Sequence, residues 1–241
     1  MALHKICSLC GHAFEEAAND VGTGKADVCP DCLATKTEIT EAYDAISNTY
    51  AEKYQDEILL KPKVQSFIAD FVKDIPQKGL ICDMGCGPGQ VARYLKNSLG
   101  RNSAGVDLSP KMIEVAAAIN PGISFKCADV LQMQEAGLYD GIIGLYFIVN
   151  FPPSQLTTLF RQLKSLLTAN GKLLLSFHIG DDILNRVESL WDSGKPCNFY
   201  FFKPETVAAS LTQAGFKVNE IRFREPDLIV EYNSQRAYIF C

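Results

Sequence analysis

Short apolar runs alternate with helical patterns along most of this chain. The runs that predict buried strands lie at residues 80–84, 103–107, 124–127, 141–149 and 172–178. The helices expected after these strands begin near Gly89, Ser109, Pro153 and Asp181. Such alternation is typical of an α/β protein in which helices cover a mostly parallel sheet.

A helical pattern also precedes the first predicted strand. Tyr43, Ile46, Tyr50 and Tyr54 recur at intervals of three and four residues, which predicts a helix with one aromatic face. Thr40 can cap this helix, because its hydroxyl can accept a hydrogen bond from an amide that the first turn leaves unpaired. We therefore expect the helix to begin at Thr40.

The remaining elements are two helices and a late hairpin. The pattern predicts one helix at about residues 64–73 and another at 204–213, closed by Gly215. Extended segments are expected at 216–223 and 237–240. These two segments would complete a seven-stranded sheet as a C-terminal antiparallel hairpin.

Four cysteines set the N-terminal segment apart. Cys7 and Cys10 form one Cys-x-x-Cys pair, and Cys29 and Cys32 form a second. Such spacing suits tetrahedral zinc, and four thiolates would make the ion structural, with no position left for substrate. A redox pair or unconnected thiols are the alternatives. We accordingly divide the chain into a zinc-ribbon-like module at residues 1–36 and a second domain at 37–241.

Charge argues against polyanionic partners. The chain has 23 basic and 28 acidic residues, and residues 1–40 hold three Lys and six acidic residues. Phosphate contacts need the opposite sign, so we expect no nucleic-acid partner and favour packing, homodimerisation or protein contact for the zinc module. The first residues lack the apolar core of a signal peptide, and the longest apolar stretch is too short for a membrane span. A cytoplasmic protein without membrane association is expected.

The most informative stretch is a glycine-rich turn that follows the first strand of the α/β pattern. Asp83 stands at the strand tip, and Gly85, Gly87 and Gly89 follow. Three glycines let the backbone turn tightly and approach a ligand closely. The next strand ends in Asp107, about 20 positions on, where a carboxylate can accept both ribose hydroxyls of a nucleoside.

A dinucleotide is the alternative ligand for this turn. Its Gly-x-Gly-x-x-Gly fingerprint, counted from Gly85, requires a third glycine where Gln90 stands. Asp83 also occupies the strand tip, where a dinucleotide site needs room and amides for pyrophosphate. A carboxylate there suits a cationic ligand with an ammonium group.

From about Tyr43 to the C-terminus the chain resembles the class I S-adenosylmethionine-dependent methyltransferases. Asp83-Met-Gly-Cys-Gly-Pro-Gly89 is similar to the first motif of that family. The resemblance implies a Rossmann-like methyltransferase fold, with Asp83 near the methionine amino group. It places Gly85, Gly87 and Gly89 under the cofactor.

Further motifs of the family follow in order. Gly105-Val-Asp107-Leu-Ser-Pro-Lys-Met112 resembles the second motif, which implies Asp107 on the ribose and Leu108 and Met112 against adenine. Cys127-Ala-Asp129-Val130 resembles the third, which implies that Asp129 and the amide of Val130 hold the adenine edge.

Two more segments complete the resemblance. Residues 139–145 resemble the fourth strand of the family, whose end at Leu145 is expected beside the methionine. Tyr43, Asp44 and Tyr50 match a Tyr-Asp-x-x-(x)n-Tyr pattern of the subgroup that acts mainly on small molecules. The match implies that Tyr43 and Tyr50 belong to a lid over the cofactor.

Candidate residues for the methyl acceptor are fewer. His178 ends the fifth predicted strand, at the sheet edge where ligands gather, so it is the candidate general base; a merely hydrogen-bonded or solvated histidine is the alternative. Asn150 precedes Phe151 rather than the prolines of an amide-methylating motif, which favours a structural turn. Trp191 and residues 199–202 suit either an acceptor pocket or the core.

Charged residues frame the last predicted hairpin. Glu225, Glu231 and Arg236 are interpreted as solvated charges without a role.

The sequence thus favours an enzyme that transfers a methyl group from S-adenosylmethionine to an unidentified small-molecule acceptor, with structural zinc. One alternative is an RNA or protein methyltransferase that uses the zinc module for recognition. Another is a non-catalytic module that only binds the cofactor.

Overall fold

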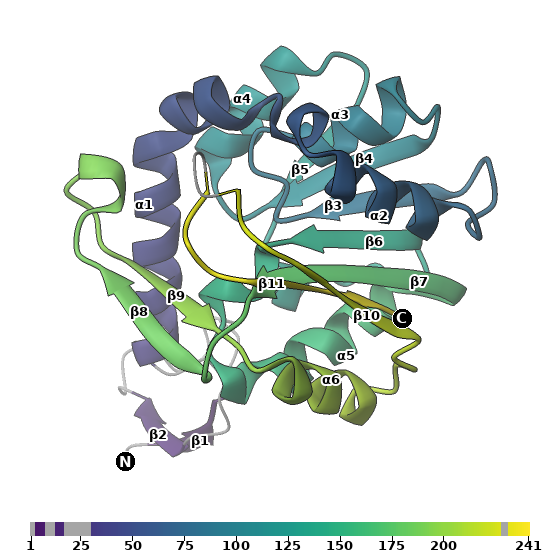
Figure 1. Cartoon of the computed structure of the whole chain (residues 1–241). Helices are drawn as coiled ribbons and strands as arrows, with labels where there is room; N and C mark the ends of the chain where they lie inside the picture. Colours follow the sequence, from purple (N-terminus) through teal and green to yellow (C-terminus); the bar gives the residue numbers. More distant parts are fainter. Residues whose placement is uncertain (1–2, 8–12, 17–29, 228–230) are drawn as a thin grey trace.

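The fold is built around one seven-stranded sheet in a computed structural model that describes residues 3–7, 13–16, 30–227 and 231–241 (Figure 1). Its strands are β3 (Leu80–Met84), β4 (Asn102–Asp107), β5 (Ser124–Cys127), β6 (Tyr139–Leu145), β7 (Leu167–His178), β10 (Glu220–Arg224) and β11 (Arg236–Phe240). They are ordered β10-β11-β7-β6-β3-β4-β5. Strands β3 to β7 are parallel, and β10 and β11 form an antiparallel hairpin at one edge. The predicted sheet is therefore confirmed.

Helices cover both faces of this sheet, with α2 and α3 on one face and α5 and α6 on the other (Figure 1). The helices are α1 (Pro30–Tyr54), α2 (Pro62–Val72), α3 (Gln90–Asn97), α4 (Pro110–Ile119), α5 (Leu156–Leu166) and α6 (Pro204–Gln213). Short 3-10 helices are η1 (Glu57–Leu60), η2 (Val130–Gln132), η3 (Phe147–Asn150), η4 (Pro153–Gln155) and η5 (Leu190–Asp192). This three-layer arrangement is that of an α/β protein.

The continuous apolar strands divide the core into two parts. In β6 and β7, Ile142 and Leu173 belong to the cluster under α5 and α6, whereas Ile143 and Leu174 belong to the cluster under α2 and α3. All four side chains are fully buried. Since successive side chains of a strand point to opposite faces, each run of apolar residues supplies both clusters.

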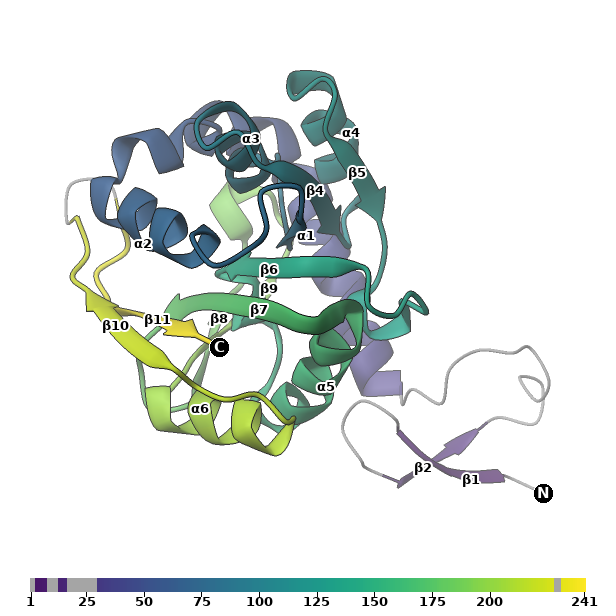
Figure 2. The same ribbon diagram turned by 90° about the vertical axis from the view of Figure 1, so that its right-hand side faces the viewer.

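Helix α1 begins earlier than predicted. It starts at Pro30, so the prediction that it starts at Thr40 is wrong. The Thr40 hydroxyl instead donates to the carbonyl of Lys36 inside the helix, at 2.9 Å. The domain boundary expected after residue 36 falls within α1, which extends as one helix from the N-terminal segment into the α/β fold (Figure 2).

The segment after β7 is a small sheet, not the predicted helix. Strands β8 (Ile183–Val187) and β9 (Cys197–Phe201) pair antiparallel. Asp182 explains the difference, because it has a left-handed backbone (φ 59) and its carboxylate accepts hydrogen bonds from Lys203 N and Thr206 Oγ1 at the start of α6. The helix expected near Asp181 is therefore wrong.

Strand β6 is also shorter than predicted. The apolar run was expected to stay extended to residue 149, but β6 ends at Leu145. Tyr146 follows with a left-handed backbone (φ 57), and the chain then continues as η3. Hydrophobicity alone could not reveal this turn, because Phe147, Ile148 and Val149 of η3 are apolar and pack into the core.

The N-terminal segment is described in part. Strands β1 (Leu3–Ile6) and β2 (Ala13–Glu16) pair antiparallel, and both lie near the first turns of α1, apart from the main sheet (Figure 2). Cys7 is buried directly after β1, whereas Cys10 and Cys29 lie outside the described residues. Within the described ranges, no group of three or more His, Cys, Asp or Glu residues could hold a metal ion, and no helix is long and apolar enough to cross a membrane.

Candidate active site

One cavity of about 450 Å³ opens at the carboxyl ends of β3, β4, β6 and β7. Helix α1, the β8–β9 sheet and the chain just before β11 surround its other sides. Ligands of open α/β sheets bind at this edge, where the loops that follow parallel strands meet. The topology therefore brings residues from distant parts of the sequence to a single site.

The glycine turn forms the floor of this cavity. Gly85, Gly87 and Gly89 all have positive φ, at 69°, 49° and 81°. A Cβ on Gly85 would lie 2.7 Å from the ring of Phe147, and one on Gly89 would lie 2.7 Å from Phe125. A Cβ on Gly87 would meet no atom closer than 3.9 Å. Gly87 is thus the position at which bare backbone faces open space.

Gly89 has a different place from the one the resemblance implies. It is the N-cap of α3 and does not line the cavity. The cavity is lined by all the other residues predicted to bind the cofactor, which are Tyr43, Tyr50, Asp83, Gly85, Gly87, Asp107, Leu108, Met112, Asp129, Val130 and Leu145. The sequence motifs thus meet in space as expected, apart from this one glycine.

Asp83 gives the glycine turn a buried acid. Its side chain is 2% exposed and accepts a hydrogen bond from Ala92 N, in the first turn of α3, at 3.1 Å. Burial raises the pKa of the carboxyl to about 7. Nearby, Gln90 Oε1 is buried without a hydrogen-bond partner among the described residues. An ammonium group bound here would satisfy both acceptors and favour the ionised carboxylate.

Asp107 connects the glycine turn to α4. One carboxylate oxygen accepts from Gly87 N at 2.8 Å and the other from Ser109 N at 2.9 Å. Burial raises the pKa of Asp107 as well. Each carboxylate oxygen has a second lone pair, so ribose hydroxyls could still donate to it.

Asp129, which follows β5, also lines the cavity. Its side chain accepts a hydrogen bond from Leu131 N at 3.0 Å and forms an ion pair with Lys36 of α1. Leu108, Met112 and Val130 line the cavity as well. The combination of an acid and apolar walls suits an adenine ring whose amino group donates to the carboxylate.

Helix α1 roofs the cavity and is fixed in two places. Tyr50 stacks on Trp191, with ring centroids 5.3 Å apart and planes inclined by 11°. Asp44 accepts hydrogen bonds from Ser109 Oγ and from Lys111 N, at the start of α4. The Asp of the Tyr-Asp pattern therefore anchors the roof and does not line the cavity.

His178, at the end of β7, lines the cavity away from the glycine turn and lies between two aromatic rings. The centroids of Tyr146 and Phe201 are each 5.0 Å from the imidazole centroid, at interplanar angles of 28° and 26°. Its Nδ1 lies 2.7 Å from Ser234 Oγ. Burial, and then the charge of Arg236, lower its pKa to about 4, so the imidazole is neutral near pH 7.

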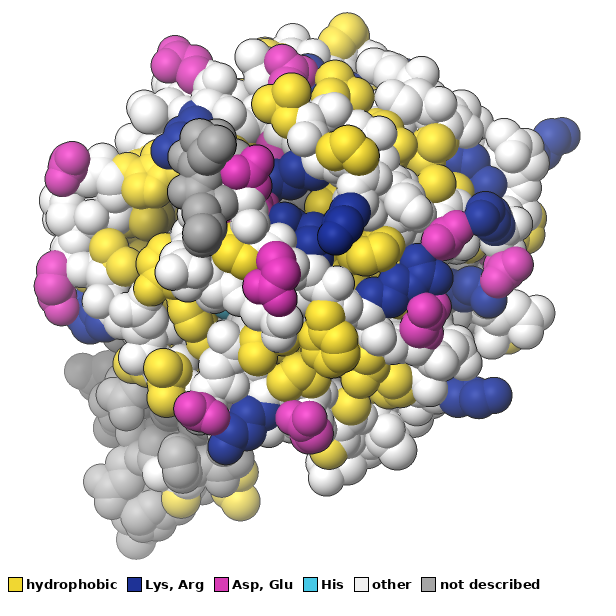
Figure 3. All heavy atoms as spheres, in the orientation of Figure 1, with side chains coloured by type: hydrophobic (Ala, Val, Ile, Leu, Met, Phe, Trp, Pro, Cys, Tyr) yellow, Lys and Arg dark blue, Asp and Glu magenta, His cyan; other side chains and the backbone are white. Residues whose placement is uncertain are grey.

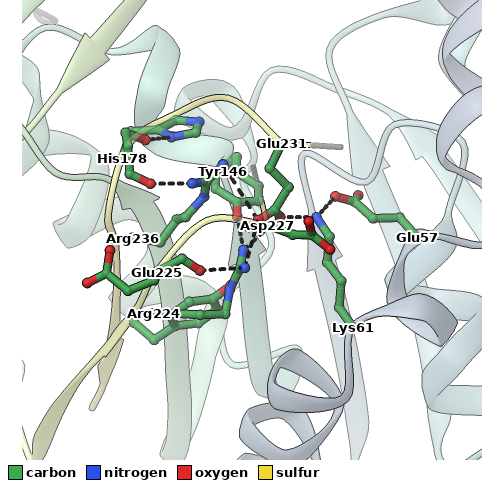
Figure 4. Close-up of polar contacts among 11 residues, drawn as sticks. Glu57, Lys61, Tyr146, His178, Arg224, Glu225, Asp227, Glu231 and Arg236 are labelled. Carbon is green, nitrogen blue, oxygen red and sulfur yellow. Dashed lines mark hydrogen bonds and ion pairs between the residues drawn. The ribbon is translucent and has the colours of Figure 1, made fainter. Parts of the chain in front are cut away.

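A cluster of buried charges adjoins His178 (Figure 4). Glu231 accepts two hydrogen bonds from Arg224, at 2.7 and 2.8 Å, and pairs with Lys61, which also pairs with Glu57. Burial opposes ionisation of Glu231, but the hydrogen bonds from Arg224 and Lys61 outweigh it and lower the pKa. Arg236 stands beside this network, 3.9 Å from the carboxylate of Glu231.

The sequence did not reveal this cluster. The interpretation of Glu231 and Arg236 as solvated charges is wrong, since their side chains are 5% and 3% exposed; only Glu225 is exposed as expected. The register of the sheet explains why, because Arg236 pairs directly with His178 across β11 and β7. No local pattern encodes a cross-strand neighbour so distant in sequence.

The aromatic segment after β7 serves two purposes. Phe199, Phe201 and Trp191 line the cavity, whereas Phe202 is fully buried in the core. Asn150 also lines the cavity; its Nδ2 donates to the carbonyl of Asn198 at 2.8 Å. This bond to β9 agrees with the structural interpretation of Asn150.

Comparisons with known proteins agree with this geometry. A family model described as "Methyltransferase domain" matches residues 81–171. A search of curated proteins finds no match. The part of the chain from β3 to the middle of β7 is therefore similar to a methyltransferase domain.

Solved structures share the fold at low sequence identity. Magnesium protoporphyrin IX methyltransferase from Synechocystis PCC 6803, with bound S-adenosylhomocysteine, has a TM-score of 0.65 and 22% identity, covering 86% of this chain and 99% of that one. An S-adenosylmethionine-dependent methyltransferase from Methanosarcina mazei has 0.63 and 16%, covering 72% and 95%. Geranyl diphosphate C-methyltransferase from Streptomyces coelicolor A3(2) has 0.58 and 14%, covering 75% and 78%. Together the findings support an S-adenosylmethionine-dependent methyltransferase.

The different surroundings of Gly87 and Gly89 give the first prediction. Gly87→Ala is expected to fold, at a cost of roughly 1–2 kcal/mol for a left-handed alanine. It should weaken S-adenosylmethionine binding about tenfold or more, because the methyl group enters the cavity. Gly89→Ala adds a clash with Phe125 and should lose more stability. Urea unfolding and calorimetric titration of both variants test this; unchanged cofactor affinity in Gly87→Ala would contradict it.

Proposed function

We propose that this enzyme transfers the methyl group of S-adenosylmethionine to a small-molecule acceptor bound beside His178. The observation that carries the proposal is a single cavity with two unlike halves. One half has three acids at strand ends, of which Asp83 is buried, and bare glycine backbone, and the other has aromatic rings around a neutral histidine. A cationic nucleoside suits the first half, and a separate acceptor suits the second.

The residues of the cofactor half suit the chemical groups of S-adenosylmethionine. Asp83 and Gln90 would hold the ammonium group, Gly85 and Gly87 would lie under the cofactor, and Leu145 would lie beside its methionine portion. Asp107 would accept from the ribose. The adenine would be bound by Leu108, Met112, Asp129 and Val130, with Tyr43 and Tyr50 covering the cofactor. Gly89 supports this site by shaping the turn into α3.

When bound, S-adenosylmethionine supplies an activated methyl group whose bond to sulfur breaks as the acceptor atom attacks, leaving the bonding electrons on sulfur. The protein's main task is therefore to hold the acceptor in line. In the tautomer whose Nδ1 donates to Ser234 Oγ, the Nε2 lone pair of His178 can take a proton from the acceptor. The stacked rings of Tyr146 and Phe201 fix the orientation of the imidazole.

The enclosure of the cavity favours a small acceptor. Helix α1 and the β8–β9 sheet surround about 450 Å³, a volume typical of small-molecule sites. Two structural neighbours are named for small molecules, magnesium protoporphyrin IX and geranyl diphosphate. On the face shown in Figure 3, acidic and basic side chains are interspersed, unlike the basic surface of a nucleic-acid-binding protein.

Labelled cofactor tests this function directly. We expect the enzyme to transfer label from methyl-labelled S-adenosylmethionine into the low-molecular-weight fraction of a metabolite extract, with S-adenosylhomocysteine formed in equal amount. Label in protein or RNA would identify a macromolecular acceptor instead. Cofactor binding without label in any fraction would indicate a non-catalytic module.

His178 gives a separate prediction about the base. His178→Gln should lower kcat by about 10² to 10⁴ when the acceptor atom carries a proton, and should leave cofactor affinity unchanged. Since the pKa of His178 is lowered to about 4, the base form persists and kcat of the native enzyme should not fall from this group between about pH 8 and pH 6. Steady-state rates across this range test both expectations. Phe223→Leu serves as the control, because Phe223 is exposed and does not line the cavity. Unaltered turnover in His178→Gln excludes the base role.

We also propose that residues 1–36 form an accessory module with structural zinc held by Cys7, Cys10, Cys29 and Cys32. Two observations support this proposal: Cys7 directly follows a strand of the β1–β2 pair, and Cys32 lies in the first turn of α1. The module would serve packing or homodimerisation in a cytosolic enzyme, where thiols stay reduced.

Metal content tests the module. The purified enzyme should contain about one zinc ion per chain, and a Cys29→Ser, Cys32→Ser double variant should contain almost none. Cys241→Ser, remote from the first residues in sequence, serves as the matched control and should retain zinc. Elemental analysis decides the matter: a zinc-free native enzyme, or full zinc in the double variant, would refute the assignment.

A further inference from the structure

The buried charges beside His178 do not balance. Three cations, Lys61, Arg224 and Arg236, face two carboxylates, Glu57 and Glu231, while His178 is neutral near pH 7. Glu225 and Asp227 also border the cluster, but both are exposed to water, which screens their charges. The acceptor half of the cavity therefore holds one excess positive charge.

The contacts identify which cation is in excess. Glu231 is engaged by both nitrogens of the Arg224 fork and by Lys61, and Glu57 also pairs with Lys61. Arg236 is left 3.9 Å from the nearest oxygen of Glu231, outside hydrogen-bond distance. Its Nη1 donates a hydrogen bond to the neutral carbonyl of Ser234. Arg236 thus lacks a close anionic partner among the described residues.

Because Arg236 is buried, its lack of a close anionic partner is energetically unfavourable. Arg236 is 2% exposed, and its Nε has no hydrogen-bond partner among the residues that the structure describes. A guanidinium removed from water is stabilised only when its charge and its donors are matched. Arg236 also lines the cavity and is the cross-strand neighbour of His178. Its free donor capacity therefore lies where the acceptor would bind.

The two halves of the cavity have opposite character. Asp83, Asp107 and Asp129 line the cofactor half. Lys36 pairs with Asp129, whereas Asp83 and Asp107 have no basic partner among the described residues. Arg236 lines the half that contains His178. An anionic molecule would be repelled from the first region and attracted to the second. The field of the protein would therefore orient a substrate that carries a negative charge at one end.

Resting on the methyl transfer proposed above, we propose that the acceptor is a small organic acid whose oxyanion, a carboxylate or phosphate, pairs with Arg236. Guanidinium matches both groups by paired N–H donors. The aromatic rings of Tyr146, Phe201 and Tyr232 would contact the apolar part of the acid. Arg236 holds the charged end, and His178 lies beside the rest of the molecule.

Fractionated acceptors test the proposal on the native enzyme. A low-molecular-weight metabolite extract is separated on an anion exchanger at neutral pH into retained and unretained pools, and each is incubated with methyl-labelled S-adenosylmethionine. We expect label to enter the retained pool. Phosphatase treatment of that pool before the reaction separates the sources, since it removes a phosphate acceptor and spares a carboxylate. Label confined to the unretained pool overturns the proposal.

A second readout does not depend on turnover. In the presence of S-adenosylhomocysteine, the retained pool should raise the melting temperature of the enzyme, and the unretained pool should not. An equal rise with both pools would contradict an anionic acceptor. Tight cofactor binding with no label and no melting shift from either pool would defeat the proposed function itself, a different outcome from label in the wrong pool.

Variants then assign the charge to Arg236. Arg236→Gln should raise the KM for the retained pool at least about tenfold and leave cofactor affinity unchanged. The KM of Arg236→Lys should lie between those of the native enzyme and Arg236→Gln. Arg222→Gln is the matched control, because Arg222 pairs with Asp70 and Glu220 outside the cavity. An unchanged KM in a folded Arg236→Gln variant refutes the assignment. If Arg236→Gln fails to fold, the KM of Arg236→Lys and the labelling of the two pools by the native enzyme still test the proposal.

Discussion

One hydrogen-bonded chain connects the glycine turn to the roof of the cavity. Asp107 accepts from Gly87 N and from Ser109 N, and the Ser109 hydroxyl donates to Asp44 of α1. The same hydroxyl accepts from Met112 N and so caps α4. The turn, the strand tip and the roof helix are therefore held in one arrangement, because a carboxylate that is partly removed from water must keep its hydrogen-bond donors.

This constraint also explains why the two halves of the cavity can differ so much. On the cofactor side, backbone amides donate to Asp83 and Asp107, and no basic side chain among the described residues pairs with either acid. Their negative charges therefore remain available to a cationic ligand. On the other side, Arg224 and Lys61 satisfy Glu231 by direct pairing. The first arrangement leaves negative potential in the cavity, and the second leaves the positive charge of Arg236.

The sequence predicted the parts of the fold that local patterns determine. Continuous apolar runs predicted the parallel strands, and the glycine turn after Asp83 together with the strand that ends in Asp107 predicted a nucleoside site at two strand tips. The acceptor half could not be predicted in this way. It depends on the register that sets Arg236 opposite His178 and on a chain reversal after Asp182, and both are products of tertiary contacts.

Backbone strain follows the same division. The non-glycine residues with positive φ in the described chain are Tyr146, Asp182, Trp191 and Asp192. Each left-handed residue costs roughly 1–2 kcal/mol, and Tyr146 and Trp191 line the cavity, where they stack on His178 and Tyr50. In the cofactor half, the residues with positive φ are glycines, which adopt this conformation without strain. The left-handed backbone at Tyr146 therefore sets an aromatic ring against His178 in the acceptor half, and the one at Trp191 sets a ring against Tyr50 of the roof helix.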